Sequence, residues 1–90
     1  MPKSPKGALL HNLNINRNIS IPIYQQIDAF LRRLILDGNL QPGQKLPSTR
    51  ELAEELNVSR ITVKTVYEQL LTEGFVQSKT GAGTFVADGL

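Results

Sequence analysis

The chain has no cysteine, a single histidine and no long apolar run. Without cysteine it forms no disulfide and offers no thiolate to a metal. His11 lies in a polar leader with no second ligand type nearby, so we expect an ordinary surface residue and no metal site. No apolar stretch approaches the ~20 residues of a membrane-spanning helix, and no signal-peptide pattern is present. We therefore expect a cytoplasmic protein without a membrane partner.

A large excess of charge of one sign is also lacking. The 90 residues have a formal net charge of +2, and a basic pI suggests an anionic partner. Three of the basic residues, Lys3, Lys6 and Arg17, fall in the first twenty residues, where there is no acid. The rest of the chain holds seven basic and eight acidic residues. Total charge therefore does not identify the partner, and the positions of individual charges must do so.

The middle of the chain contains two short amphipathic helices around a tight corner. Ser48 and Glu51 have the S-x-x-E spacing of a reciprocal capping box, which predicts the start of the first helix. Asn57 can take the left-handed conformation that ends this helix. Ser59 is a second N-cap, and Gly74 ends the second helix. Two capped helices around a corner are typical of a helix-turn-helix, whose second helix is free to enter a DNA major groove.

The segments on either side predict one more helix and a β-hairpin. A wide apolar stripe between residues 24 and 35 is typical of a helix packed on a core. Phe75–Ser78 and Thr84–Val86 have the pattern of two short strands around a loose tip, Lys79–Gly83. The predicted fold class is mainly α with a small β-hairpin. In this order the elements make a winged helix-turn-helix, with three helices and a wing of two to three strands.

Two arginines occupy positions that the fold does not require. Arg60 opens the second helix of the pair, and Arg50 lies in the first turn of the preceding helix. Positive charge at a helix N-terminus is unfavourable by a few tenths of a kcal/mol. A DNA phosphate at that end reverses the sign, because backbone N–H groups and the arginine then act together. The alternative for Arg50 is an ion pair with Glu54, worth ~0.2–0.5 kcal/mol at best.

The first turn of the second helix also contains Ile61. At ~100° per residue, Ile61 points away from the apolar side of this helix. The residues on that apolar side are Val63, Val66, Tyr67 and Leu70, and Leu71 recurs with them at helical spacing. An exposed isoleucine here can pack on a thymine methyl, although scattered surface isoleucines are also normal. The remaining candidates for phosphate or base contacts on this helix and on the hairpin are Ser59, Thr62, Lys64, Lys79 and Thr80.

Four motifs in this order and spacing resemble one protein family: P-G-Q-K-L-P-S-T-R-E-L-A, V-S-R-I-T-V, Y-E-Q-L-L-T-E-G-F and G-A-G-T-F-V. Over about residues 20–87 they are similar to the winged-helix domain of the GntR family of bacterial transcription regulators. The leader N-L-N-I-N-R and the helix start I-P-I-Y-Q-Q-I most resemble the MocR branch, with the YtrA branch second. The resemblance implies a sequence-specific DNA-binding domain. Its recognition helix, about Arg60–Glu73, would enter the major groove, and its wing tip, Lys79–Gly83, the adjacent groove.

The resemblance also implies site residues, partners and domain organisation. The family's DNA contacts fall on Ser48, Arg50, Ser59, Arg60, Thr62, Lys64, Thr80 and Gly81. Ile61 departs from the pattern, because relatives often have a polar residue there. The implied partner is a double-stranded DNA operator with repeated half-sites, bound by a homodimeric full-length protein.

The expected domain organisation is a flexible N-terminal arm at 1–19, the winged helix at 20–87 and the start of a linker at 88–90. The linker would lead to an aminotransferase-like domain that binds pyridoxal phosphate and is not in this chain. No cofactor is expected within residues 1–90.

Two other classes of function compete with DNA binding. A winged helix used only for protein contacts is the alternative, although an interface of that kind favours exposed aromatic residues over arginines. An enzyme is excluded, because the chain has no cysteine, one histidine and no paired carboxylates in a plausible cleft. It also has no phosphate-cradling motif between a strand and a helix. We therefore expect no catalytic residue.

Overall fold

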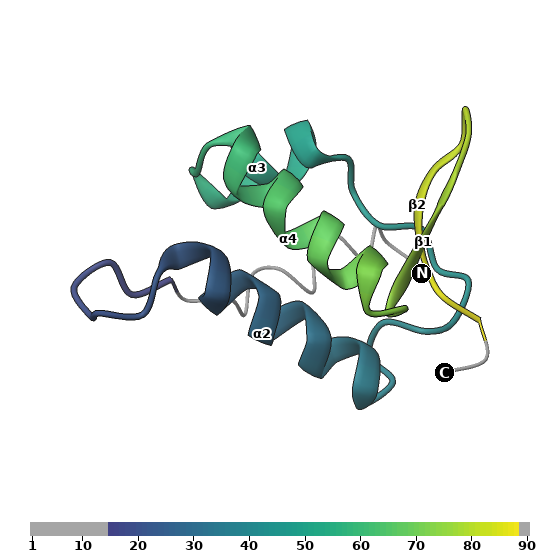
Figure 1. Cartoon of the computed structure of the whole chain (residues 1–90), viewed down its shortest axis with the longest axis horizontal. Helices are drawn as coiled ribbons and strands as arrows, with labels where there is room; N and C mark the ends of the chain where they lie inside the picture. Colours follow the sequence, from purple (N-terminus) through teal and green to yellow (C-terminus); the bar gives the residue numbers. More distant parts are fainter. Residues whose placement is uncertain (1–14, 89–90) are drawn as a thin grey trace, which may run out of the picture.

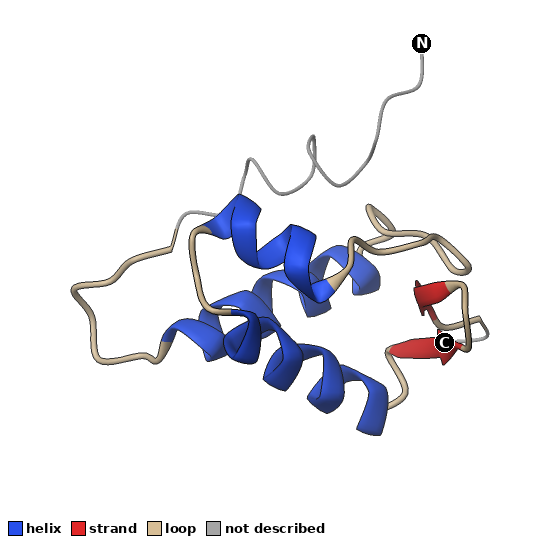
Figure 2. Ribbon diagram, turned by 90° about the horizontal axis from the view of Figure 1, so that it is seen from above, coloured by secondary structure: helices blue, strands red, loops and turns tan. Residues whose placement is uncertain are grey.

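The computed structural model describes residues 15–88. Within them the chain forms three helices and a hairpin: α2 (Ile23–Leu36), α3 (Thr49–Leu56), α4 (Arg60–Thr72), β1 (Val76–Lys79) and β2 (Gly83–Val86) (Figure 1). Seen from above, the hairpin lies at one end of the helical layer (Figure 2). This is the winged helix-turn-helix that the sequence predicts. No helix in the described part of the chain is long and apolar enough to cross a membrane.

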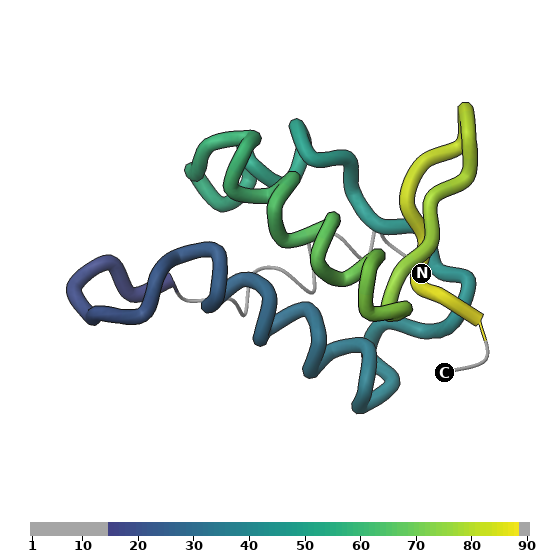
Figure 3. The backbone as a smooth tube through the Cα atoms, in the orientation of Figure 1, coloured from purple at the N-terminus to yellow at the C-terminus, as the bar shows by residue number. Residues whose placement is uncertain are grey.

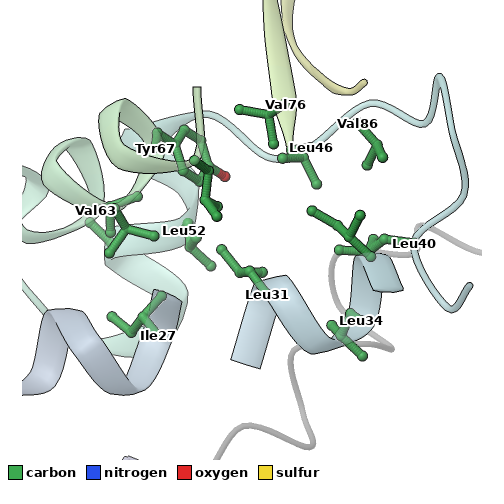
Figure 4. Packing of buried hydrophobic residues seen from close by; sticks show 14 residues of the cluster. Ile27, Leu31, Leu34, Leu40, Leu46, Leu52, Val63, Tyr67, Val76 and Val86 are labelled. Carbon is green, nitrogen blue, oxygen red and sulfur yellow. The ribbon is translucent and has the colours of Figure 1, made fainter. Parts of the chain in front are cut away.

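The core lies where α4 packs against both other helices and the base of the hairpin. Figure 4 shows Ile27 and Leu31 of α2 on the side that faces Leu52 and Val63. The predicted stripe of α2 is confirmed at its centre, while Tyr24 and Phe30 at its edges are only half-buried. The fully buried side chains of largest volume are Ile27, Leu52, Val63, Val66, Leu70 and Val86. Helix α4 is thus fixed from two sides, which sets its orientation.

The predicted core side of α4 is confirmed, because Val63, Val66, Tyr67 and Leu70 are all buried. Leu71 recurs with them at helical spacing, but 46% of its surface is exposed. Successive helical residues point ~100° apart, so one of two adjacent leucines must leave the centre of the contact. Leu71 instead borders a groove between α4 and the hairpin.

The hairpin is antiparallel, and Val76 pairs with Val86 at its base. Both strands reach one residue further toward the tip than predicted, because Lys79 and Gly83 belong to β1 and β2, and β1 begins at Val76 rather than at Phe75. A third segment, residues 44–46, lies on the other side of β2. There the Leu46 N–H donates to the Thr84 carbonyl at 2.8 Å, and Lys45 forms a bridge with Phe85. The wing is therefore a hairpin extended by one short edge segment.

The residues before α2 are attached to the helices. Ile15 packs on the core, and its neighbour Asn16 exchanges two hydrogen bonds of 2.9 Å with the side chain of Gln26. The guanidinium of Arg17 donates to the carbonyl of Asn57, in the helix-turn-helix corner, at 3.1 Å. Residues 1–14 of the predicted arm lie outside the described residues. The part of the arm that is described, residues 15–19, makes specific contacts with the domain.

Candidate nucleic-acid interface

The start of α3 is capped as the sequence predicts. The Ser48 Oγ accepts a hydrogen bond from the Glu51 N–H at 3.0 Å, and the Glu51 carboxylate accepts one from the Ser48 N–H at 3.0 Å. At the other end, Asn57 has a left-handed backbone, with φ of 58°. Because both ends of this helix are determined locally, the corner that follows and the start of α4 have a defined position.

The start of α4 combines a cap with an isolated positive charge. The Ser59 Oγ accepts a hydrogen bond from the Thr62 N–H at 3.1 Å and lies 2.8 Å from the Thr62 hydroxyl. Arg60 follows, and the first turn contains no acidic residue. Its exposed side chain makes no ion pair within the described part of the chain. A cation at the positive end of a helix dipole is favourable when an anion binds there.

Arg50 adds a second positive group in the first turn of α3. Its Nε lies 3.6 Å from a carboxylate oxygen of Glu54, so the alternative ion pair is present. Both side chains are mostly exposed, at 71% and 72%. Exposed pairs of this kind contribute little, and solvent and salt screen them. Arg50 can therefore exchange Glu54 for a phosphate at small cost.

Ile61 and Lys64 lie on the outer side of α4. Ile61 is 74% exposed, the highest value among the large apolar side chains of the described residues. On the other side of the helix, Val63 and Val66 are fully buried. The helical spacing thus predicted the direction of Ile61 correctly. Lys64 is exposed on the same helix, and it lines the groove toward the wing.

The wing contributes an exposed tip. Residues 79–81 are exposed, and Gly81 has a φ of +76°, which glycine adopts without strain. Lys79 belongs to β1 rather than to the tip, and its Nζ lies 4.9 Å above the centre of the Phe85 ring. The tip of the wing and the start of α3 lie on the same side of the molecule, which is at the top of both Figure 1 and Figure 3.

A groove of about 220 Å³ separates the wing from α4. It is lined by both polar and apolar side chains, namely Thr49, Lys64, Tyr67, Glu68, Leu71, Val76, Ser78 and Thr84. Only Lys64 among these was predicted as a site residue. The sequence did not predict the others as site residues. Val76, Ser78 and Thr84 reach the groove only because the hairpin packs beside α4, which local spacing does not show.

Comparison with known proteins places this arrangement in a family. Residues 23–86 match the model of the gntR family of bacterial regulatory proteins. The chain is 45% identical, over 75 residues, to the probable rhizopine catabolism regulatory protein MocR of Rhizobium meliloti. This match includes 83% of the chain but only 15% of MocR, so the chain spans a small part of the length of that relative.

Two solved structures have the same fold. The GntR-family transcription factor YtrA of Sulfolobus acidocaldarius superposes with a TM-score of 0.81 and 38% identity, over 87% of this chain and 82% of YtrA. The DNA-binding domain of AraR, solved in complex with operator ORR3, has a TM-score of 0.71 and 32% identity, over 82% of this chain and 89% of AraR.

These relatives are regulatory proteins, which agrees with the prediction of a non-enzymatic domain. The chain belongs to the gntR family of bacterial regulatory proteins, and residues 23–86 are its winged helix-turn-helix DNA-binding domain.

Proposed function

We propose that the domain recognises operator DNA through one surface, which we call the reading surface. Helix α4 lies in the major groove, and the wing tip reaches the adjacent groove. The observation that carries this proposal is Arg60, exposed and, among the described residues, without an ion pair at the capped N-terminus of α4. The residues of the reading surface are Ser48, Arg50, Ser59, Arg60, Ile61, Thr62, Lys64, Lys79, Thr80 and Gly81.

The two helix N-termini and the wing have different tasks on this surface. Backbone N–H groups at the start of α3, together with Arg50, hold a phosphate and position the domain on the duplex. Arg60 and Ile61, in the first turn of α4, reach base edges and provide sequence preference. Exposed backbone at Gly81 allows the wing tip to approach the sugar-phosphate chain closely.

Specific binding requires two domains on repeated half-sites about one helical turn apart. Outside the first twenty residues the domain has no net positive charge, so a single copy gains little non-specific affinity. The full-length protein is proposed to be a cytoplasmic homodimer. Gel shifts that show tight one-to-one binding of this chain to a single half-site would contradict the two-copy requirement.

The resemblance to the MocR branch supports a further proposal about the full-length protein. After residue 90 it would continue through a linker into an aminotransferase-like domain that binds pyridoxal phosphate, and no residue of the present chain is assigned to that cofactor. Absorbance spectra of the full-length protein mixed with pyridoxal phosphate test this. A spectrum unchanged from that of the free cofactor would contradict it.

Arginine variants test the reading surface. Arg60→Ala and Arg50→Ala should leave the fold intact, because neither side chain is buried. If Arg60 contacts a base, its replacement should weaken binding by ~1–3 kcal/mol, mostly at one base pair. Replacement of a phosphate-binding arginine should weaken binding to all sequences and flatten the salt dependence. Arg33→Ala on α2 is the matched control. DNA affinities equal to the control in both variants would favour a protein-contact module instead.

A further inference from the structure

The wing has two faces with different chemistry. Alternate residues of paired strands point to the same face. Leu46, Val76 and Val86 are buried, so they mark the face toward the helices. Register then places Lys45 opposite Phe85, and Lys79 opposite Gly83, on the other face. We call this second face the outer face of the wing.

On the outer face, the side chain of Lys45 extends along the sheet toward the hairpin tip. A Cβ built on Gly83 would lie 3.1 Å from the Lys45 Cε and 3.8 Å from its Nζ. Gly83 is two residues closer to the tip than Phe85, the partner of Lys45. The end of the lysine side chain therefore lies over Gly83, where a Cβ would press against its Cε. The lysine uses the space that the glycine leaves open.

Lys79 approaches the same region from the other edge of the sheet. Its Nζ lies 4.9 Å from the centre of the Phe85 ring, which holds a cation over the aromatic face. Two ammonium groups thus lie on one face of β2, one beside Gly83 and the other over the Phe85 ring. They come from the two segments that flank β2. An anion placed against this face would be attracted by both positive charges.

Neither lysine has a carboxylate partner among residues 15–88. Asp88 lies at the base of the wing, where its Oδ1 is 3.4 Å from the position of a Cβ on Gly43. Gly43 is at the end of the edge segment away from the tip, and Lys45 extends in the opposite direction. Within the described part of the chain, the positive charge on the outer face is therefore not neutralised.

We infer that Lys45, together with Lys79, binds a backbone phosphate of the duplex beside the groove that the wing tip enters. The inference rests on the proposed function, and it extends the reading surface to a residue in the segment before α3. Lys45 is a phosphate contact, so it adds affinity and fixes the position of the wing without reading sequence. The outer face of the wing then follows the sugar-phosphate chain.

The salt dependence of duplex binding tests for such a contact, because each phosphate that a lysine neutralises adds to the slope of log affinity against log salt. The full chain would be titrated with a mixed-sequence duplex between about 0.05 and 0.2 M salt, and the slope of log affinity against log salt compared between variants. Lys45→Met keeps the aliphatic stem over Gly83 and removes the charge. It should reduce the slope by about 0.9 and weaken binding about five- to tenfold at ~0.1 M salt. Lys45→Arg keeps the charge and should keep the slope.

Arg33→Met is the matched control, because it removes one exposed charge from α2, a helix that contains no residue of the reading surface. A slope that falls equally in Lys45→Met and Arg33→Met would overturn the inference. Lys45 would then contribute only to the total charge of the protein, without contacting a phosphate. Unfolding curves that match the unmutated chain would show that neither change acts through the fold. If the unmutated chain binds neither this duplex nor operator DNA selected from a random pool, the proposed function fails. If Arg60→Ala weakens binding and Lys45→Met does not, only this inference fails.

Discussion

The hydroxyl of Tyr67, in the middle of α4, donates a hydrogen bond of 2.6 Å to the backbone carbonyl of Pro47. Both residues are buried, and Pro47 immediately precedes the cap of α3. The bond therefore joins the recognition helix to the entrance of the helix before it. Figure 4 shows the Tyr67 oxygen among otherwise apolar side chains. This hydrogen bond is one of the contacts that hold the start of α3 against α4.

Replacement of Tyr67 by phenylalanine should destabilise the domain by about 1–2 kcal/mol. The ring still fills its place, but the buried Pro47 carbonyl loses its partner. Urea unfolding, followed by far-UV circular dichroism, measures this difference. Tyr24→Phe, at a half-buried site on α2, is the control and should have a smaller effect. Equal stability of Tyr67→Phe and the unmutated chain would show that water replaces the hydroxyl.

The same hydroxyl makes stability depend on alkaline pH. Burial, with a smaller contribution from the negative charge of Glu51, raises the pKa of Tyr67 above its ordinary value of about 10. The folded state therefore retains a proton that the unfolded state loses. Its contribution is complete below about pH 10 and decreases as pH rises from there through the raised pKa. The stability difference between the unmutated chain and Tyr67→Phe should accordingly decrease above about pH 10, and a constant difference would contradict the assignment.

The capping box at the start of α3 predicts a graded loss of stability. Ser48→Ala removes an acceptor from the Glu51 N–H and should cost about 1 kcal/mol. Ser48→Gly should cost only a few tenths of a kcal/mol, because glycine is tolerated at an N-cap. Thermal melts of the two variants measure the difference. If the two variants are equally stable, water takes the place of the Ser48 hydroxyl as the acceptor for the Glu51 N–H.

A substitution at Ile61 tests whether this residue contacts a base, and it does so without disturbing the fold. Ile61→Asn should change stability little, because 74% of the side chain is exposed already. On DNA it should change the preferred base pair at one position per half-site by ~1 kcal/mol or more, because asparagine does not pack on a thymine methyl. Binding to operators with T·A changed to C·G at each position measures this. An identical ranking of sites for both proteins would leave Ile61 as an ordinary surface residue.

Local features of the fold could be predicted from the sequence, and long-range pairings could not. The caps at Ser48 and Ser59 and the left-handed Asn57 depend on residues at most three positions apart, and the structure confirms all of them. The exposure of Ile61 follows from helical periodicity alone. The contact of Arg17 with Asn57 joins residues 40 positions apart, and no spacing pattern marks it.

The candidate site divides in the same way. Residues at the two helix starts were predicted from their position relative to a cap and a dipole. Lys45 was not predicted, because its place on the wing requires β2, which comes about 40 residues later, to pair with the segment before α3.

The edge segment of the wing also determines when this domain can complete its fold during synthesis. Residues 44–46 precede the helix pair, whereas their partner strand is nearly the last part of the domain to be made. Until β2 has left the ribosome, the polar backbone of this segment and the apolar side chain of Leu46 have no partner on the wing side. Closure of that long loop therefore comes late. A nascent chain that stops before residue 83 should show helices but remain sensitive to protease between α2 and α3.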